Sequence, residues 1–277
     1  MRNRTAYLVI GVLGLCCLGL LESVIYPVST VESHADTPGE EQFAVADREQ
    51  YSMTGQVVVD GDQQFGFEDV QTASGERYQR IEETDSSTER YQPESNASIY
   101  KRHTMDAETN VDTMREQIIG DDAQELRREH RNEDHVTFIV KLNSSDPSVG
   151  FPTPDAVVVQ SLSAVRYTQA EETTETDRFT PQSGWYGDSE GYRVTNATGD
   201  VRADTDTYEI DSAAVSWDVT TPADSYAEYV LHRLGSDAPT THDIVVDVRE
   251  ADPELSQPEW VTDAQHDNST ASGSDDA

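Results

Sequence analysis

The feature that most restricts how this chain can fold is its excess of negative charge. Its 277 residues include 54 Asp and Glu but only 19 Lys and Arg, which gives a formal net charge of −35. In dilute buffer the mutual repulsion of these charges opposes any compact state, whereas at molar salt the screening length falls to about 3 Å. We therefore expect carboxylates to be spread over the surface, and we expect folding to depend on molar salt.

The kinds of charged residue agree with this expectation. All but two of the 19 cationic residues are arginine, the exceptions being Lys101 and Lys141, and carboxylates occur along the whole chain. This composition resembles that of proteins of halophilic archaea, whose surfaces are dense in Asp and Glu and poor in Lys. It excludes sequence-independent nucleic-acid binding, because that binding needs many cationic side chains to displace counterions from phosphates.

The N-terminus has the pattern of a membrane anchor. Arg2 and Arg4 precede an uncharged apolar run over residues 6–21, and the apolar character continues to residue 28. A helix of that extended length spans the roughly 30 Å hydrocarbon core of a bilayer. Because cationic flanks stay on the cytoplasmic side, we expect a single-pass protein of the cell membrane with the bulk of the chain outside.

Two other interpretations of this segment stay open. A cleaved signal peptide has the same charged start, although the only Ala-x-Ala sequence, residues 44–46, lies well beyond the apolar run. A lipid-modified cysteine is the other, although Leu15 precedes Cys16 where a small residue is needed. Cys16 and Cys17 are the only cysteines, so the rest of the chain has no disulfide and no cysteine-bound metal.

Asn-x-Ser/Thr sequons are more frequent than composition alone predicts. The chain has five, where its Asn, Ser and Thr content predicts roughly one. Asn3 lies on the cytoplasmic side of the predicted anchor. The other four are candidates for N-glycosylation, which fits an extracytoplasmic domain: Asn96, Asn143, Asn196 and Asn268.

Strand and turn patterns dominate after residue 50. Asp60 and Gly61 supply the positive φ angles of a tight turn between strands at 55–59 and 63–72, and residues 135–142 form the clearest strand of the first half. Further strands are expected at 77–82, 98–104, 185–186, 192–195, 207–210, 213–219 and 243–248. Helices are expected over 106–119, 123–131 and 222–234, while the run 156–167 fits either a helix or a strand.

This order of elements predicts an α+β fold built on an antiparallel sheet with a few helices. The parts are an N-terminal membrane anchor (1–28), a polar spacer (29–50), an antiparallel α+β extracytoplasmic domain (51–262) with an internal break near 143–155, and a disordered acidic tail (263–277). Over residues 40–250 the order is similar to the curved half-barrel sheet of periplasmic lipoprotein-carrier proteins. That similarity is topological, and it implies a cavity for an apolar ligand.

Three sequence patterns suggest chemical sites, and each departs from the motif it resembles. Residues 187–191 match G-x-S-x-G around Ser189, but a nucleophile elbow needs a following helix and residues 192–195 favour a strand. His130 and His135 lack the H-E-x-x-H spacing, and the acidic residues at 200–211 lack an EF-hand pattern. We therefore expect no catalytic residue, no cofactor and no metal site.

The sequence thus predicts a membrane-anchored extracytoplasmic domain with a binding or structural role and no enzymatic activity. Its expected partners are the membrane, through the N-terminal helix, and either an envelope protein or a small apolar ligand. A ligand or lipid carrier-like module is the alternative, and a surface serine hydrolase using Ser189, with Asp218 and His242 downstream, is the least supported one. A carrier needs an apolar cavity, whereas polar neighbours of the core strands favour a plain solvated face; these neighbours are Thr137, Lys141, Ser216 and Asp218.

Overall fold

A computed structural model describes residues 43–45, 49–142, 151–152, 154–172, 176–186, 192–204, 206–221, 231–232, 234, 238–250 and 253–266. The predicted anchor and most of the predicted helix at 222–234 lie outside these ranges. Residues 267–277 of the predicted disordered tail (263–277) also lie outside them, whereas residues 263–266 belong to a helix, because Ala264 is buried in a hydrophobic core. None of the described helices is both long and apolar enough to cross a membrane.

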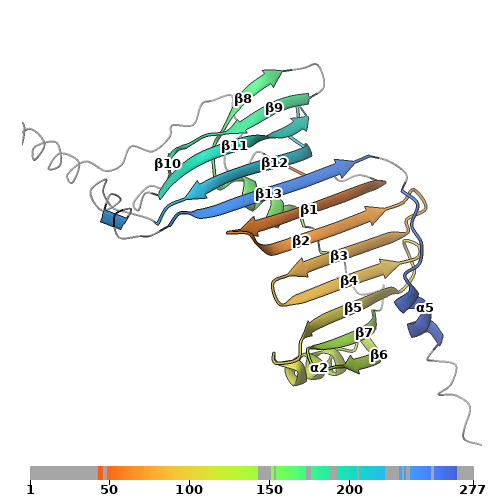
Figure 1. The fold of residues 1–277 in the computed structure, drawn as a ribbon. Coiled ribbons are helices and arrows are strands. Elements are labelled where there is room, and N and C mark those ends of the chain that lie inside the picture. Colours follow the sequence, from red (N-terminus) through yellow and green to blue (C-terminus); the bar gives the residue numbers. More distant parts are fainter. Residues whose placement is uncertain are drawn as a thin grey trace, which may run out of the picture.

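The first half of the chain forms a run of antiparallel strands (Figure 1). Five strands follow one another as hairpins: β1 (Tyr51–Val59), β2 (Asp62–Gln71), β3 (Arg77–Glu83), β4 (Ser86–Gln92) and β5 (Ile99–Asp106). After helix α2 (Val111–Gly120), β6 (Gln124–Arg131) forms one edge of the sheet. β7 (His135–Leu142) then pairs between β6 and β5.

The second half adds strands to the other side of β1. Helix α3 (Asp155–Leu162) precedes six strands: β8 (Tyr167–Glu172), β9 (Thr176–Pro181), β10 (Gly184–Tyr186), β11 (Tyr192–Asp204), β12 (Ile210–Val219) and β13 (Thr240–Arg249). Because β13 pairs with β1, the sheet is continuous in the order β6-β7-β5-β4-β3-β2-β1-β13-β12-β11-β9-β8, and β10 pairs with β11 off this path. Helix α5 (Glu259–His266) follows. The prediction of a strand-rich α+β fold with an antiparallel sheet is confirmed.

The strand register divides the sheet into two faces. Residues directly opposite each other on antiparallel strands point to the same side. Such pairs can be followed from strand to strand across the sheet. They begin at Phe138, which packs with α2, and end at Val246, which packs with α3. The residues between them are His103, Thr88, Ile81, Phe67 and Gly55. Both helices therefore lie on one face, called the inner face below, and the opposite face is called the outer face.

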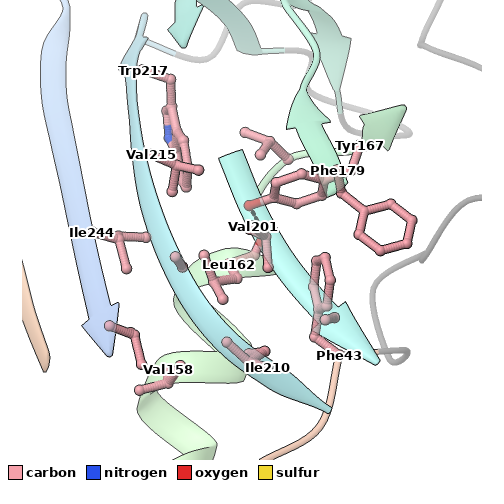
Figure 2. Packing of buried hydrophobic residues seen from close by; sticks show 14 of the residues in the cluster. Phe43, Val158, Leu162, Tyr167, Phe179, Val201, Ile210, Val215, Trp217 and Ile244 are labelled. Carbon is pink, nitrogen blue, oxygen red and sulfur yellow. Dashed lines mark hydrogen bonds between the residues drawn. The ribbon is translucent and has the colours of Figure 1, made fainter. Parts of the chain in front are cut away.

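The largest hydrophobic core lies on the inner face of the C-terminal strands. Figure 2 shows α3 placing Val158 and Leu162 against the side chains of β12 and β13. Phe43, from the segment predicted as a polar spacer, packs edge-to-face on Tyr167 and Phe179 with ring centroids 5.1 and 5.7 Å apart. Burial of these large side chains is the main stabilising contribution to this half.

Two smaller cores hold the other helices. On the inner face, α2 packs Val111 and Ile118 against Phe138 and other residues of β7. On the outer face, α5 packs around Trp260 against Tyr91 and Ile139. On the inner face, α2 therefore covers the β6–β7 end of the strand order and α3 covers β12 and β13 near its middle. The segment of β2–β5 between these helices carries the site described below.

Three local predictions need correction. The segment 123–131, predicted as a polar helix, instead forms strand β6 from Gln124 onward, because hydrogen bonds to β7 outweigh its modest helix propensity. Helix α2 begins at Val111 and not at 106, because β5 extends to Asp106. Thr207 lies in a turn and not in a strand, because its backbone N–H donates to the carboxylate of Asp204.

Candidate functional site

The residues proposed for a serine hydrolase do not form an aspartate–histidine pair in the described part of the chain. Ser189 lies outside the described residues. Asp218 is on the outer face, where it accepts hydrogen bonds from Asn196 Nδ2 at 2.6 Å and Thr241 Oγ1 at 2.8 Å. His242 is on the inner face, stacked on the ring of Trp217. Asp218 and His242 therefore point to opposite sides of the sheet.

The histidines and aspartates considered as metal ligands are also separated. Among the described residues, no group of three or more His, Cys, Asp and Glu is arranged to hold a metal ion. His130 faces Thr137 across β6 and β7, and His135 starts β7 opposite Asp106. The carboxylate of Asp204 accepts hydrogen bonds from the backbone of residues 207 and 206, and these bonds lower its pKa. It serves a turn.

Two of the four glycosylation candidates fall among the described residues. Asn96 lies in the turn between β4 and β5, and Asn196 lies at an irregular position of β11 with φ 54°. Both are exposed. Asn143 and Asn268 lie outside the described residues.

A polar network that the sequence patterns do not reveal lies on the inner face of β2 and β3. Asp69 and Gln79 are each 0% exposed. Arg77 donates to both carboxylate oxygens of Asp69, at 3.1 and 2.7 Å, and Gln79 Nε2 donates to Asp69 Oδ2 at 2.8 Å. This bidentate pair with a further donor satisfies the buried carboxylate, which would otherwise be strongly unfavourable.

The same network holds the chain that leads into α3. We call Phe151, Pro152 and Pro154 the strap. Gln79 Nε2 also donates to the carbonyl oxygen of Pro152 at 2.7 Å, and the guanidinium carbon of Arg77 lies 4.4 Å from the ring centroid of Phe151. The strap is thereby fixed against the inner face of β2 and β3, about seventy residues away in the sequence.

Next to this network lies what we call the basic cluster: Arg90, Lys101 and His103. Arg90 and Lys101 are directly opposite on β4 and β5, and Thr88 and His103 form the adjacent pair on the same face. Thr88 Oγ1 and His103 Nδ1 are 2.9 Å apart. Arg90 donates to Gln79 Oε1 at 3.3 Å, while its buried Nε has no hydrogen-bond partner among the described residues.

Burial and mutual repulsion shape the electrostatics of the basic cluster. Burial lowers the pKa of Arg90, although Asp69 opposes this shift. Burial and the charge of Arg90 lower the pKa of Lys101. The pKa of His103 falls to about 4, mainly through burial and then through Lys101 and Arg90. His103 is therefore neutral at pH 7, and no carboxylate in the described part of the chain forms an ion pair with Arg90 or Lys101 to relieve their positive charge.

A pocket of about 260 Å³ opens beside the basic cluster. Its apolar walls come from three separate segments: Phe65 and Ile81 of the sheet, Pro152 and Pro154 of the strap, and Val157 of α3. Its polar lining consists of Thr88, Arg90 and the exposed Glu83. Apolar walls with a few polar groups are typical of small-molecule sites, whose volumes start at roughly 300 Å³.

Two other hollows among the described residues have a different character. One of about 410 Å³ lies at hairpin ends and is lined by acidic residues, including Glu82, Glu83 and Asp85. Another of about 280 Å³ borders Glu68, Arg80 and Glu82. Among the residues that line these hollows, Met105 is the only apolar one of the first and Phe67 the only one of the second apart from glycine.

The neutral His103 predicts a pH-dependent stability. Its pKa is about 4 in the folded state but about 6.5 when unfolded, so the unfolded state binds more protons between these values. Stability is therefore full above pH 6.5 and falls as the pH drops toward 4. From pH 7 to pH 5, wild type should lose about 1 kcal/mol more than His103→Gln, after allowing for partial exposure.

Thermal unfolding of both chains at molar salt, followed by circular dichroism at the two pH values, measures this difference. Burial also lowers the pKa of His242, but its effect on the pH dependence of stability is the same in wild type and variant and cancels in the comparison. Equal losses of stability in the two chains would contradict the assignment.

Comparisons of the chain with protein-family models, with curated proteins and with solved structures found no match.

Proposed function

We propose that the chain is a membrane-anchored extracytoplasmic domain that binds a small amphiphilic ligand on the inner face of its sheet and catalyses no reaction. The observation that carries this proposal is the pocket enclosed by β2–β4, the strap and α3. Anchoring rests on the apolar run after Arg2 and Arg4, and the external location rests on the positive-inside rule and the sequons.

The pocket combines two kinds of surface. Phe65, Ile81 and Val157 offer apolar contact, while Thr88 and Arg90 of β4 and the exposed Glu83 of β3 offer polar groups. A ligand with one apolar and one polar part matches that division. An open antiparallel sheet with α3 on its inner face is also compatible with a carrier-like role.

A second candidate is binding of another envelope protein. It is favoured by the two edges of the sheet, because β6 and β8 each pair with one neighbour among the described strands. An edge strand presents unpaired backbone groups that another chain can extend. The pocket is the more specific feature, since it is built from segments far apart in the sequence.

Native mass spectrometry of the full-length chain tests the proposal. The chain is purified from membranes in detergent at molar salt, alongside two variants. Val157→Trp fills the pocket from the half-buried wall of α3, and Val245→Trp adds the same bulk at a residue 43% exposed on the outer face.

We expect a bound small amphiphile in wild type and in Val245→Trp, at about one per chain, and at least tenfold less in Val157→Trp. Folded wild-type chain free of any small molecule, and free of exogenous amphiphile after incubation, would overturn the proposal. So would equal occupancy in Val157→Trp.

A further inference from the structure

We propose that Arg90, Lys101 and His103 bind the anionic head group of the ligand, so that the ligand is an anionic amphiphile with a carboxylate or phosphate head. This inference rests on the proposed function and specifies its ligand. The head group would lie at the basic cluster, and the apolar part would lie along Phe65, Ile81 and Val157.

The first support is position. Arg90 lines the pocket, and Lys101 lies directly opposite Arg90 on the next strand. His103 is two residues further along β5 on the same inner face. Arg90 thus brings the cluster to the pocket, with Lys101 and His103 next to it on the neighbouring strand, and the buried Arg90 Nε is a donor that no described residue satisfies.

The second support is the contrast with most of the arginines in the described part of the chain. The ion pairs join nine other arginines to carboxylates: Arg77, Arg80, Arg102, Arg115, Arg127, Arg128, Arg178, Arg202 and Arg249. Arg90 forms no such pair with a described carboxylate, and Asp69, the acid that acts on it, is already bonded to Arg77 and Gln79. In a chain of 54 acidic residues, two adjacent half-buried cations without an ion pair to any described carboxylate are unusual.

The third support is energetic. Like charges directly opposite on neighbouring strands destabilise a sheet, and partial burial makes the repulsion stronger. An anion between Arg90 and Lys101 would remove the repulsion and form charge-assisted hydrogen bonds with both. The site is therefore complementary to a negative head group in the absence of any ligand.

Fluorescence titration of the full-length chain at molar salt tests the inference. The probes are a pyrene-labelled dodecanoate, its neutral methyl ester and the corresponding dodecyl phosphate. The variants are Arg90→Gln and Lys101→Met, which keep much of each side chain's volume. Arg249→Gln, at an arginine side chain that is 74% exposed, is the matched control.

We expect wild type and Arg249→Gln to bind the carboxylate probe at least tenfold more tightly than they bind the ester. A hydrogen bond to a charged group contributes enough binding free energy for a difference of that size. Lys101→Met and Arg90→Gln should each lose most of that preference and keep ester binding. Both should also melt at a higher temperature than wild type without ligand, because each removes one of the two opposed cations. A phosphate probe that binds more tightly than the carboxylate indicates a phosphate head, and equal binding indicates that charge alone is recognised.

Equal binding of ester and carboxylate to wild type would overturn the inference and leave the proposed function standing. An unchanged preference of Lys101→Met for the carboxylate over the ester would also overturn the inference. This variant decides the test if Arg90→Gln fails to fold. Failure of all three probes to bind wild type would instead count against the proposed function itself.

Discussion

Replacement of Asp69 by alanine is expected to destabilise the folded state by about 3–5 kcal/mol, the range for removing one partner of a buried ion pair. Asp69 is 0% exposed and accepts three hydrogen bonds from Arg77 and Gln79. Its loss leaves the Arg77 guanidinium without its carboxylate and frees Gln79, which holds Pro152 of the strap. The effect should therefore combine an unpaired charge with a loosened strap.

Chemical denaturation at molar salt measures the change in free energy of unfolding. Asp247→Ala is the matched control, because Asp247 pairs with Arg249 on β13 with both side chains well exposed. That pair should contribute at most about 1 kcal/mol. Asp69→Asn keeps an acceptor oxygen and should fall between the two. Similar losses for Asp69→Ala and Asp247→Ala would contradict the buried network.

Gly199→Ala is expected to cost about 3 kcal/mol or more, through conformation and through contact. Gly199 has φ 91°, and a Cβ built on it would lie 1.9 Å from the carbonyl oxygen of Ala214 on β12. That atom is backbone, so the strand pair β11–β12 must shift to accommodate a methyl group. The shift would reach the core that α3 covers, since Val201 and Val215 line it.

Gly61→Ala separates the two contributions. Gly61 has a similar φ of 87° in the turn between β1 and β2, but apart from Gly61 and its two chain neighbours no atom of the described residues lies within 4 Å of the position that a Cβ would take. Only the conformational cost of about 1–2 kcal/mol should remain. Equal unfolding free energies for the two alanine variants would show that β11 and β12 can separate at Gly199 without cost.

Much of the sheet follows from local sequence. Asp60 and Gly61 form the predicted turn between β1 and β2, with φ values of 53° and 87°. The apolar run at 135–142 is β7, with the expected bounds. Four polar neighbours of the core strands lie on the outer face, as alternation requires: Thr137, Lys141, Ser216 and Asp218. Local signals suffice there because turn chemistry and alternation act over a few residues.

Other elements depend on distant partners. The segment 124–131 is almost wholly polar and carries no strand pattern, so its conformation comes from pairing with β7. Its charged residues resemble a solvated helix when read alone. Tertiary pairing of this kind overrides weak local propensity.

The candidate site could not be predicted from the sequence for a related reason. Thr88, Arg90, Lys101 and His103 alternate along β4 and β5 like the residues of a solvated face. The alternation of residues along a strand separates the two faces of the sheet, but it does not predict which face other segments of the chain will cover. The strap and α3 that cover this face come from residues 151–162, so only the folded chain brings apolar walls to the basic cluster.

Photo-crosslinking locates the ligand and so tests the central claim most directly. A dodecanoate with a diazirine at the end of its chain is activated on the full-length chain at molar salt, and the modified peptides are mapped. Binding on the inner face predicts adducts at Phe65, Ile81 and Val157, with loss of these adducts in Lys101→Met. Adducts that gather instead on the outer face around Trp260 and Tyr91 would contradict the claim that the inner face is the binding surface.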